Sequence, residues 1–182
     1  MALARRVDRP LQPSLRTRSD VFPIPIGSRA PRTPVRQALA PVIDRMRSRA
    51  KARGVRIAGR VADDVGAVID AHLLQDVVGT LLDNALASSC PGDIVEIECA
   101  PREGIVMLSV ADQGPARADH ARGTIFGSDE GRAHGLRRRA PGNSGLAFCR
   151  EVALAHGGDA WTYNRQRGGT CYVFEVKSAT EA

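Results

Sequence analysis

The sequence DAHLLQDVVGTLLDNALASS (residues 70–89) predicts an amphipathic helix that begins at a side-chain cap. Asp70 is a good N-cap, because its carboxylate can accept hydrogen bonds from the free N–H groups of the first turn. The residues of the apolar face are Leu74, Val78, Leu81 and Ala85. The residues of the polar stripe, at every fourth position, are Asp76, Thr80, Asn84 and Ser88. By itself such a stripe indicates only the solvated face of a helix.

The chain on both sides of this helix predicts further helices and strands. Residues 93–100 (DIVEIECA) and 104–111 (GIVMLSVA) alternate apolar and polar residues, which predicts a hairpin. We expect a first helix that has Thr33 as its N-cap, is kinked by Pro41 and ends at Gly54. The other expected elements are a strand at 55–61, an extended piece at 67–69, a helix at 144–156, and a hairpin of 160–164 with 170–176. This order predicts an α/β protein: a two-layer α/β sandwich with one mixed, mostly antiparallel sheet covered on one face by helices.

Composition divides the 182 residues into a tail and one domain. Residues 1–32 combine proline and arginine, so we expect a basic linker or tail, followed by a domain at 33–178 and a short tail at 179–182. Aromatic residues make up only 4%, so the core must consist mainly of Val, Leu, Ile and Ala. Residues 117–141 are rich in Gly, Arg and His and are longer than an ordinary connection, which predicts a lid or a disordered segment.

The chain has no run of about 18 apolar residues and no apolar stretch behind its first arginines, so we expect neither a membrane segment nor a secretory signal. Its four cysteines lack CxxC spacing, which indicates reduced thiols. These features predict a cytoplasmic location.

Charge is unevenly distributed. Residues 1–60 hold fifteen Lys or Arg against three Asp or Glu, and residues 61–182 hold eleven against seventeen. Such a basic arm could meet nucleic acid or an acidic partner surface. The absence of interleaved aromatic residues and of a DNA-reading motif argues against nucleic acid. An arginine-rich linker followed by a solvated helix face is the alternative.

Two glycine-containing turns could carry chemistry. Asp112 follows an apolar strand and precedes Gly114, although an aspartate in a turn often has only a structural role. Residues 142–145 (GNSG) lead directly into a predicted helix, whose free N–H groups and dipole could face an anion.

Four segments resemble, in order, the histidine-kinase ATPase family, which shares its fold with gyrase, Hsp90 and MutL. They are residues 80–85 (TLLDNA), 110–115 (VADQGP), 145–158 (GLAFCREVALAHGG) and 168–170 (GGT), similar to the N, G1 and G2 boxes and the closing Gly-Thr strand. The resemblance covers about residues 34–177. It implies a Bergerat-type ATP-binding fold, with ATP and Mg²⁺ as ligands.

The resemblance also implies roles for single residues. Asn84 would supply an amide oxygen to Mg²⁺. Asp112 would accept a hydrogen bond from the adenine amine, and Gly114 would let the backbone approach the base. Thr170 would hold a water between Asp112 and adenine. The other residues implied in ATP binding are Ser88, Ala116, Gly142, Gly145 and Leu146, with Gly145 and Leu146 presenting N–H groups to the phosphates. Residues 117–141 would be the ATP lid, with Phe126 a remnant of the F box.

Several positions depart from the family pattern. Thr80 stands where another asparagine is common, Gly79 where an acid or histidine is common, and Ala87 where a basic residue is frequent. Ala116 replaces the second G1 glycine, and residues 141–146 (PGNSGL) hold fewer glycines than the usual G2 box. We therefore expect nucleotide binding with a weak hold on phosphate and slow turnover.

None of the four histidines has the sequence context of a phospho-acceptor, and no catalytic side chain is assigned. They are His72, His120, His134 and His156. The expected function is the ATP-binding catalytic domain of a two-component sensor histidine kinase. It would transfer the γ-phosphoryl to a histidine on a separate or missing dimerisation domain, with a response regulator as a further partner.

Two alternatives share this fold. The first is a degenerate, non-catalytic module that docks on a kinase or a response regulator. The second is a serine-phosphorylating switch of the anti-sigma type, which usually has an acid near the start of the N box, where this chain has Gly79 and Thr80. A P-loop ATPase is excluded, because the chain has no GxxxxGK[ST] motif.

Overall fold

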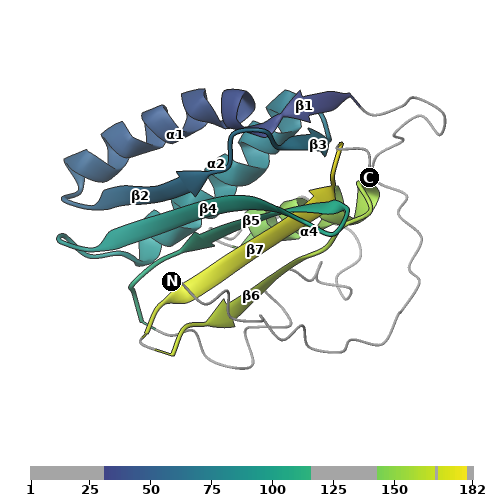
Figure 1. Ribbon diagram of the computed structural model, residues 1–182. Coiled ribbons are helices and arrows are strands. Elements are labelled where there is room, and N and C mark those ends of the chain that lie inside the picture. Colours follow the sequence, from purple (N-terminus) through teal and green to yellow (C-terminus); the bar gives the residue numbers. More distant parts are fainter. Residues whose placement is uncertain (1–30, 116–142, 167, 180–182) are drawn as a thin grey trace, which may run out of the picture.

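The computed structural model of the protein describes residues 31–115, 143–166 and 168–179 (Figure 1). Its elements are β1 (Arg32–Pro34), α1 (Val35–Ala52), β2 (Arg56–Val61), β3 (Gly66–Val68), α2 (Ala71–Ser88), β4 (Ile94–Arg102), β5 (Ile105–Ala111), α4 (Asn143–Ala155), β6 (Ala160–Asn164) and β7 (Thr170–Lys177). Five strands form a sheet in the order β2-β4-β5-β7-β6, and β1 pairs with β3 in a small separate sheet. Within the larger sheet β2 and β4 are parallel and the other pairs are antiparallel, which confirms the mixed, mostly antiparallel arrangement.

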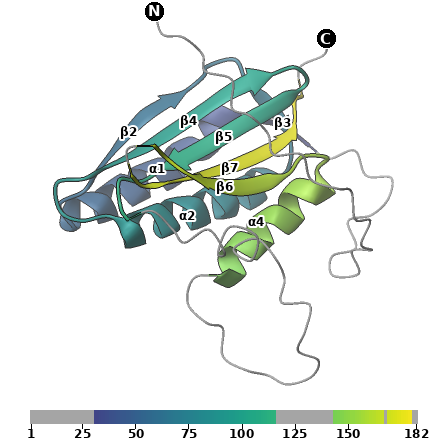
Figure 2. The same ribbon diagram turned by 90° about the horizontal axis from the view of Figure 1, so that it is seen from below.

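The helices α1, α2 and α4 lie together on one face of this sheet (Figure 2). Alternation along β4 explains the two faces, because Val95, Ile97 and Cys99 are buried whereas Glu96 and Glu98 are exposed. The largest fully buried side chains between the layers include Leu39, Met46, Leu81, Leu82, Ile97, Leu108, Tyr172 and Phe174. The described residues thus confirm the predicted two-layer α/β sandwich.

The start of α1 differs from the prediction. Thr33 is not the N-cap; it lies in β1, opposite Ala67 of β3, and its hydroxyl donates to the carbonyl oxygen of Ile69. Pro34 occupies the cap position without a side-chain hydrogen bond, and the helix continues through Pro41 to Ala52. The hydroxyl that was expected to cap the helix therefore bonds instead to a residue that is distant in the sequence, next to the strand β3.

The start of α2 agrees with the prediction. The Asp70 carboxylate accepts hydrogen bonds from the main-chain N–H groups of His72 (2.8 Å) and Leu73 (3.1 Å). The predicted apolar face is buried against the sheet, with Leu74, Val78, Leu81 and Ala85 at most 2% exposed. The hairpin of β4 with β5 and that of β6 with β7 also form as expected.

All four cysteines are free thiols, and only Cys90 is exposed. None of the helices in the described ranges combines the length and the hydrophobicity that a membrane span needs. The expected lid at 117–141 lies outside the described residues.

Candidate functional site

The candidate site is centred on Asp112, directly after the end of β5. Its side chain is fully buried, and its Oδ1 atom accepts hydrogen bonds from the main-chain N–H groups of Gly114 and Thr170, each at 3.0 Å. Asp112 also donates its own N–H to the carbonyl oxygen of Thr170 at 3.0 Å. A carboxylate has about four acceptor positions, so two N–H bonds fix its orientation without exhausting its capacity.

Two glycines allow close main-chain contacts around Asp112. A Cβ atom at Gly114 would lie 2.2 Å from the carbonyl oxygen of Ser88, the last residue of α2. A Cβ atom at Gly169 would lie 2.0 Å from the carbonyl oxygen of Asp112, and Gly169 has a φ of +88°, which side chains rarely adopt. The turn after β5 therefore meets the end of α2 closely at Gly114 and the residue before β7 closely at Gly169, and both close contacts require glycine.

The polar stripe of α2 runs toward the same place. The Thr80 hydroxyl donates to the carbonyl oxygen of Asp76 (2.8 Å), the Asn84 amide nitrogen to that of Thr80 (2.8 Å) and the Ser88 hydroxyl to that of Asn84 (3.3 Å). Because the amide nitrogen of Asn84 is held by its own helix, its oxygen is the atom that this residue can offer to a cation. Ser88 instead presents its main chain to Gly114.

The start of α4 lies against the middle of α2. A Cβ atom at Gly145, in the first turn of α4, would lie 2.9 Å from Cγ2 of Thr80, so a larger residue there would force a local shift at the contact of the two helices. Leu146 is fully buried and anchors this end of α4. No acidic residue occurs in the first turn of α4, so the dipole and free N–H groups of this end favour an anion.

Seven of the nine residues predicted for ATP binding lie in the described part of the chain, and contacts link them into one region. Gly145 contacts α2 beside Asn84, Ser88 contacts Gly114, and Asp112 joins Gly114 to Thr170. Ala116 and Gly142 lie outside the described residues, as does Phe126.

Sequence reasoning did not identify Arg165 as part of this region. Its Nη1 atom donates to the carbonyl oxygen of Asp112 at 3.3 Å, and its Nη2 atom lies 2.7 Å from Oε2 of Glu96. Arg165 follows β6 in the hairpin that returns as β7, which places a cation beside Asp112. A basic residue four positions before Gly169 was the only available signal, and it indicated no more than a turn.

The residues present fit a magnesium nucleotide. A buried carboxylate held by close backbone contacts at Gly114 and Gly169 suits the amine of a base, and the start of α4 suits phosphate. The described residues hold no group of three or more His, Cys, Asp or Glu side chains that could bind a metal by themselves. Magnesium would therefore need phosphate oxygens in addition to the amide oxygen of Asn84, which is how this ion is commonly held.

Comparison with known proteins agrees with this geometry. The sequence profile of the histidine kinase-, DNA gyrase B- and HSP90-like ATPases matches residues 69–180. The adaptive-response sensory kinase SasA of Prochlorococcus marinus is 32% identical over 127 residues, which cover 68% of this chain and 33% of SasA. The sensor histidine kinase component HK1 of Mycobacterium tuberculosis is 30% identical over 131 residues, which cover 72% of this chain and 76% of HK1.

A solved structure extends the likeness to three dimensions. Full-length ShkA in complex with AMPPNP is 26% identical and superposes with a TM-score of 0.66 over 83% of this chain and 32% of ShkA. The chain thus spans about a third of SasA and of ShkA, and most of HK1. The matched profile begins just before α2 and includes Asp112, directly after β5, and Thr170, the first residue of β7. Together with the sandwich fold, this places the chain in the histidine kinase-, DNA gyrase B- and HSP90-like ATPase family.

Proposed function

We propose that this chain binds ATP with Mg²⁺ and transfers the γ-phosphoryl group to a histidine on a separate dimerisation domain. The observation that carries the proposal is the buried carboxylate of Asp112, held by two main-chain N–H groups between two glycine-dependent contacts. The AMPPNP complex of the related ShkA supports the same ligand class.

Asp112 would select the base. Its carboxylate accepts hydrogen bonds, and adenine presents an amine where guanine presents a carbonyl oxygen. A guanine in the same position would set two acceptors against each other in a buried site, which is costly. Thr170, 2% exposed beside Asp112, would hold a water between the carboxylate and the base.

Asn84 and the first turn of α4 would hold the phosphate end of the nucleotide. When bound, magnesium supplies neutralisation of the negative charge on the phosphate oxygens. The amide oxygen of Asn84 would hold the ion, and the N–H groups at Gly145 and Leu146 would face the phosphates. Phosphoryl transfer depends on placement and charge neutralisation, so these residues can act without a covalent intermediate.

The acceptor histidine would come from another polypeptide or domain. His72 lies exposed in the first turn of α2, and the Nδ1 atom of His156 lies 2.8 Å from the carbonyl oxygen of Val152 in the turn after α4. His120 and His134 lie outside the described residues. The description of HK1 as a component of a sensor histidine kinase supports an acceptor on a second chain, from which a response regulator would receive the phosphoryl group. We also propose a cytoplasmic location, because ATP as a substrate and the free thiols of Cys99, Cys149 and Cys171 are consistent with it.

A binding-only module is the second candidate, and Thr80 favours it. The hydroxyl of Thr80 donates to its own helix and its methyl group faces Gly145, so this step of the stripe offers no acid or base. Such a module would keep the shape of the nucleotide site but would not transfer a phosphoryl group.

Two measurements separate these candidates. Calorimetric titration with AMPPNP, with and without Mg²⁺, should give magnesium-dependent binding. Radiolabelled ATP should leave the isolated chain unlabelled and should label a histidine-bearing dimerisation domain of a related kinase with acid-labile phosphate. Acid-labile label on the isolated chain would contradict the separate acceptor. Binding of AMPPNP without label on any supplied acceptor would establish the binding-only module instead.

A further inference from the structure

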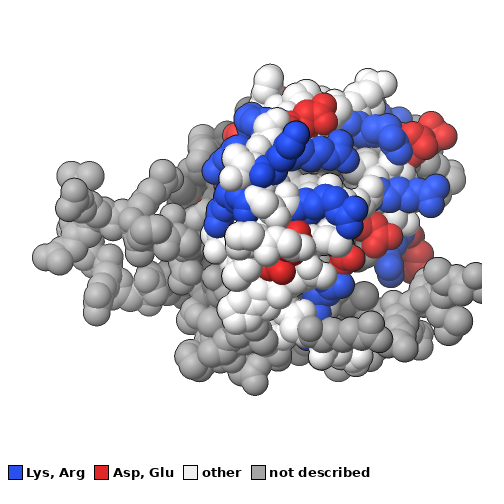
Figure 3. Space-filling model, turned by 90° about the vertical axis from the view of Figure 1, so that its left-hand side faces the viewer, with Lys and Arg blue, Asp and Glu red and all other residues white. Residues whose placement is uncertain are grey.

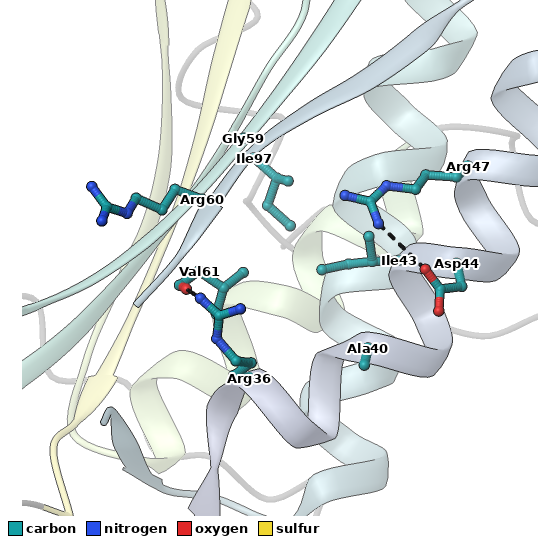
Figure 4. Close-up of a pocket in the computed structure, with 9 residues that line it drawn as sticks. All are labelled: Arg36, Ala40, Ile43, Asp44, Arg47, Gly59, Arg60, Val61 and Ile97. Atoms are coloured by element: carbon teal, nitrogen blue, oxygen red, sulfur yellow. Dashed lines mark hydrogen bonds and ion pairs between the residues drawn. The ribbon is translucent and has the colours of Figure 1, made fainter. Parts of the chain in front are cut away.

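A second surface lies at the opposite side of the sheet from β6, where a groove runs between α1 and the outer edge of β2 (Figure 4). Its volume is about 220 Å³, below the roughly 300 to 1,000 Å³ of small-molecule pockets. The neighbouring strand β4 separates β2 from β5, which leads to Asp112. The groove is therefore distinct from the nucleotide site and is better suited to a narrow segment of chain.

One wall of the groove is the outer edge of β2, with which no strand pairs among the described residues. The main-chain N–H groups of Arg56 and Ala62 donate to carbonyl oxygens of β4 and its flank, at Asp93 and Cys99, each at 3.0 Å. Main-chain groups alternate in direction along a strand, so the odd-numbered residues of β2 direct theirs away from β4. Val61 confirms this direction, because its carbonyl oxygen accepts a hydrogen bond from Arg36 of α1. Gly59 is exposed at this edge.

The floor of the groove is apolar. Ile43 of α1 and Ile97 of β4 line it, and Figure 4 shows both side chains between the helix and the strand. Gly59 cannot carry a side chain, because a Cβ atom there would lie 1.8 Å from the carbonyl oxygen of Ile97. The side chain of Arg60 points away from the groove in the same view. An added strand would thus meet apolar groups on one face and arginine on the other.

The surroundings of the groove are strongly basic. Residues 31–60 contain nine Lys or Arg and one acidic residue, Asp44. Within the described ranges, five of these cations make no ion pair: Arg45, Arg53, Arg56, Arg60 and Lys51. Figure 3 shows Lys and Arg side chains gathered at the end of the molecule where α1 leads into β2, next to the groove. Like charges would repel a second copy of the same edge, so the arginines disfavour self-pairing and favour an acidic partner.

We propose that the groove between α1 and β2 binds an acidic, extended segment of another polypeptide, which joins the sheet as a strand beside β2. Main-chain hydrogen bonds to the edge at Ile57 and Gly59 would supply affinity. Alternate side chains would supply specificity: acidic ones beside Arg56 and Arg60, and small apolar ones in the groove against Ile43. The proposal does not depend on nucleotide binding.

A fluorescently labelled peptide of about eight residues, alternating Glu with Val, tests it by anisotropy with the full chain at about 0.15 M salt. We expect saturable binding. A peptide with the same composition in two blocks, and an alternating peptide methylated at every second amide nitrogen, should each bind about tenfold more weakly, because one loses the side-chain pattern and the other the ladder hydrogen bonds.

Matched variants locate the site. The double substitution Arg56→Glu with Arg60→Glu should weaken peptide binding about tenfold or more. Arg102→Glu, a single charge reversal at the exposed far end of β4, should leave binding nearly unchanged, and Arg60→Glu alone is the variant to compare with it. Ala40→Trp, at an exposed groove position on α1, should block binding without altering the basic charge. Thermal unfolding and AMPPNP titration of each variant show whether it remains folded.

Three outcomes would overturn the proposal. The first is equal binding of the block or methylated peptide. The second is an equal loss in Arg102→Glu or no loss in Ala40→Trp, since either would indicate general charge attraction. The third is tighter binding of duplex DNA or phosphatidylserine vesicles than of the peptide at the same salt, which would assign the basic face to another class of partner.

Discussion

Replacing Asp112 by asparagine changes one atom at the centre of the proposed nucleotide site. In the structure, Oδ1 of Asp112 accepts the N–H groups of Gly114 and Thr170, each at 3.0 Å. The amide oxygen of asparagine can accept both bonds, so the turn should keep its shape. The other side-chain atom becomes an NH₂ group, which donates where the adenine amine also donates. Asp112→Asn should therefore harm ATP binding far more than folding.

The size of this effect follows from burial. A hydrogen bond to a charged group contributes about 1.5 to 3 kcal/mol, and a buried donor left without an acceptor costs about 1 to 3 kcal/mol. Asp112 is 0% exposed, so solvent cannot relieve the mismatch. The two contributions together raise the dissociation constant for ATP about 10²- to 10⁴-fold. The free energy of unfolding should change by less than about 2 kcal/mol, because the two N–H bonds persist in weaker, neutral form.

Calorimetric titration with AMPPNP and the corresponding guanine analogue measures both affinity and base preference. Asp70→Asn is the matched control, because the Asp70 carboxylate also accepts two main-chain N–H groups but lies at the start of α2, away from Asp112. The control should bind AMPPNP like the parent protein. A folded Asp112→Asn protein that binds AMPPNP as tightly as the parent, with the same preference for adenine, would refute the role given to Asp112.

Three further predictions concern other parts of the fold. Gly169→Ala should lower the free energy of unfolding by more than about 2 kcal/mol in urea titrations, and Gly104→Ala by only about 1 kcal/mol. Both glycines have positive φ, but only a Cβ atom at Gly169 meets backbone, so equal effects would contradict the close approach. Asn84→Ala should bind AMPPNP equally with and without Mg²⁺ in calorimetry, and a retained magnesium dependence would exclude its amide as the ligand. Burial raises the pKa of the Cys99 and Cys149 thiols from 9.0 to about 12, so the unfolded chain loses these protons first as pH rises. In urea titrations above pH 9, the free energy of unfolding should fall by about 1.4 kcal/mol per pH unit for each thiol. The double variant Cys99→Val with Cys149→Ala should show a smaller fall, and an equal fall would contradict the assignment of this pH dependence to the two thiols.

Local periodicity was sufficient to predict most elements of this fold. The helix α2 combines a cap, an apolar face and a polar stripe within twenty residues, and all three features reappear in the structure. The hairpin of β4 with β5 likewise depends on alternation and on a turn that includes Gly104, whose φ is +81°. Such signals lie within one element or between neighbours in sequence, so no knowledge of the rest of the chain is needed.

Pairings between distant segments could not be predicted in the same way. The sequence gives no local sign that β1 pairs with β3, so Thr33 was wrongly predicted as a helix cap. The parallel pairing of β2 with β4 joins segments on either side of α2 in the sequence, and within the described part of the chain it leaves β2 at the edge of the sheet. The contact of Arg165 with Asp112 similarly depends on the register of β5 with β7, which places Ala111 opposite Cys171.

The site itself shows why a motif needs its surroundings. The polar stripe of α2 is compatible with a solvated helix face, and no pattern within the helix separates that reading from a binding surface. Contacts with two other segments of the chain favour the binding surface. Gly114 meets the end of the stripe at Ser88, and Gly145 meets its middle at Thr80. The turn after β5 and the start of α4 therefore lie against the helix on the two sides of Asn84 along α2. In the proposed site, Asn84 would hold the magnesium ion between the base at Asp112 and the phosphates at the start of α4. The polar stripe is therefore one wall of the proposed site. The hydroxyl of Thr80 donates to its own helix, so at this position the wall offers no acid or base for phosphoryl transfer.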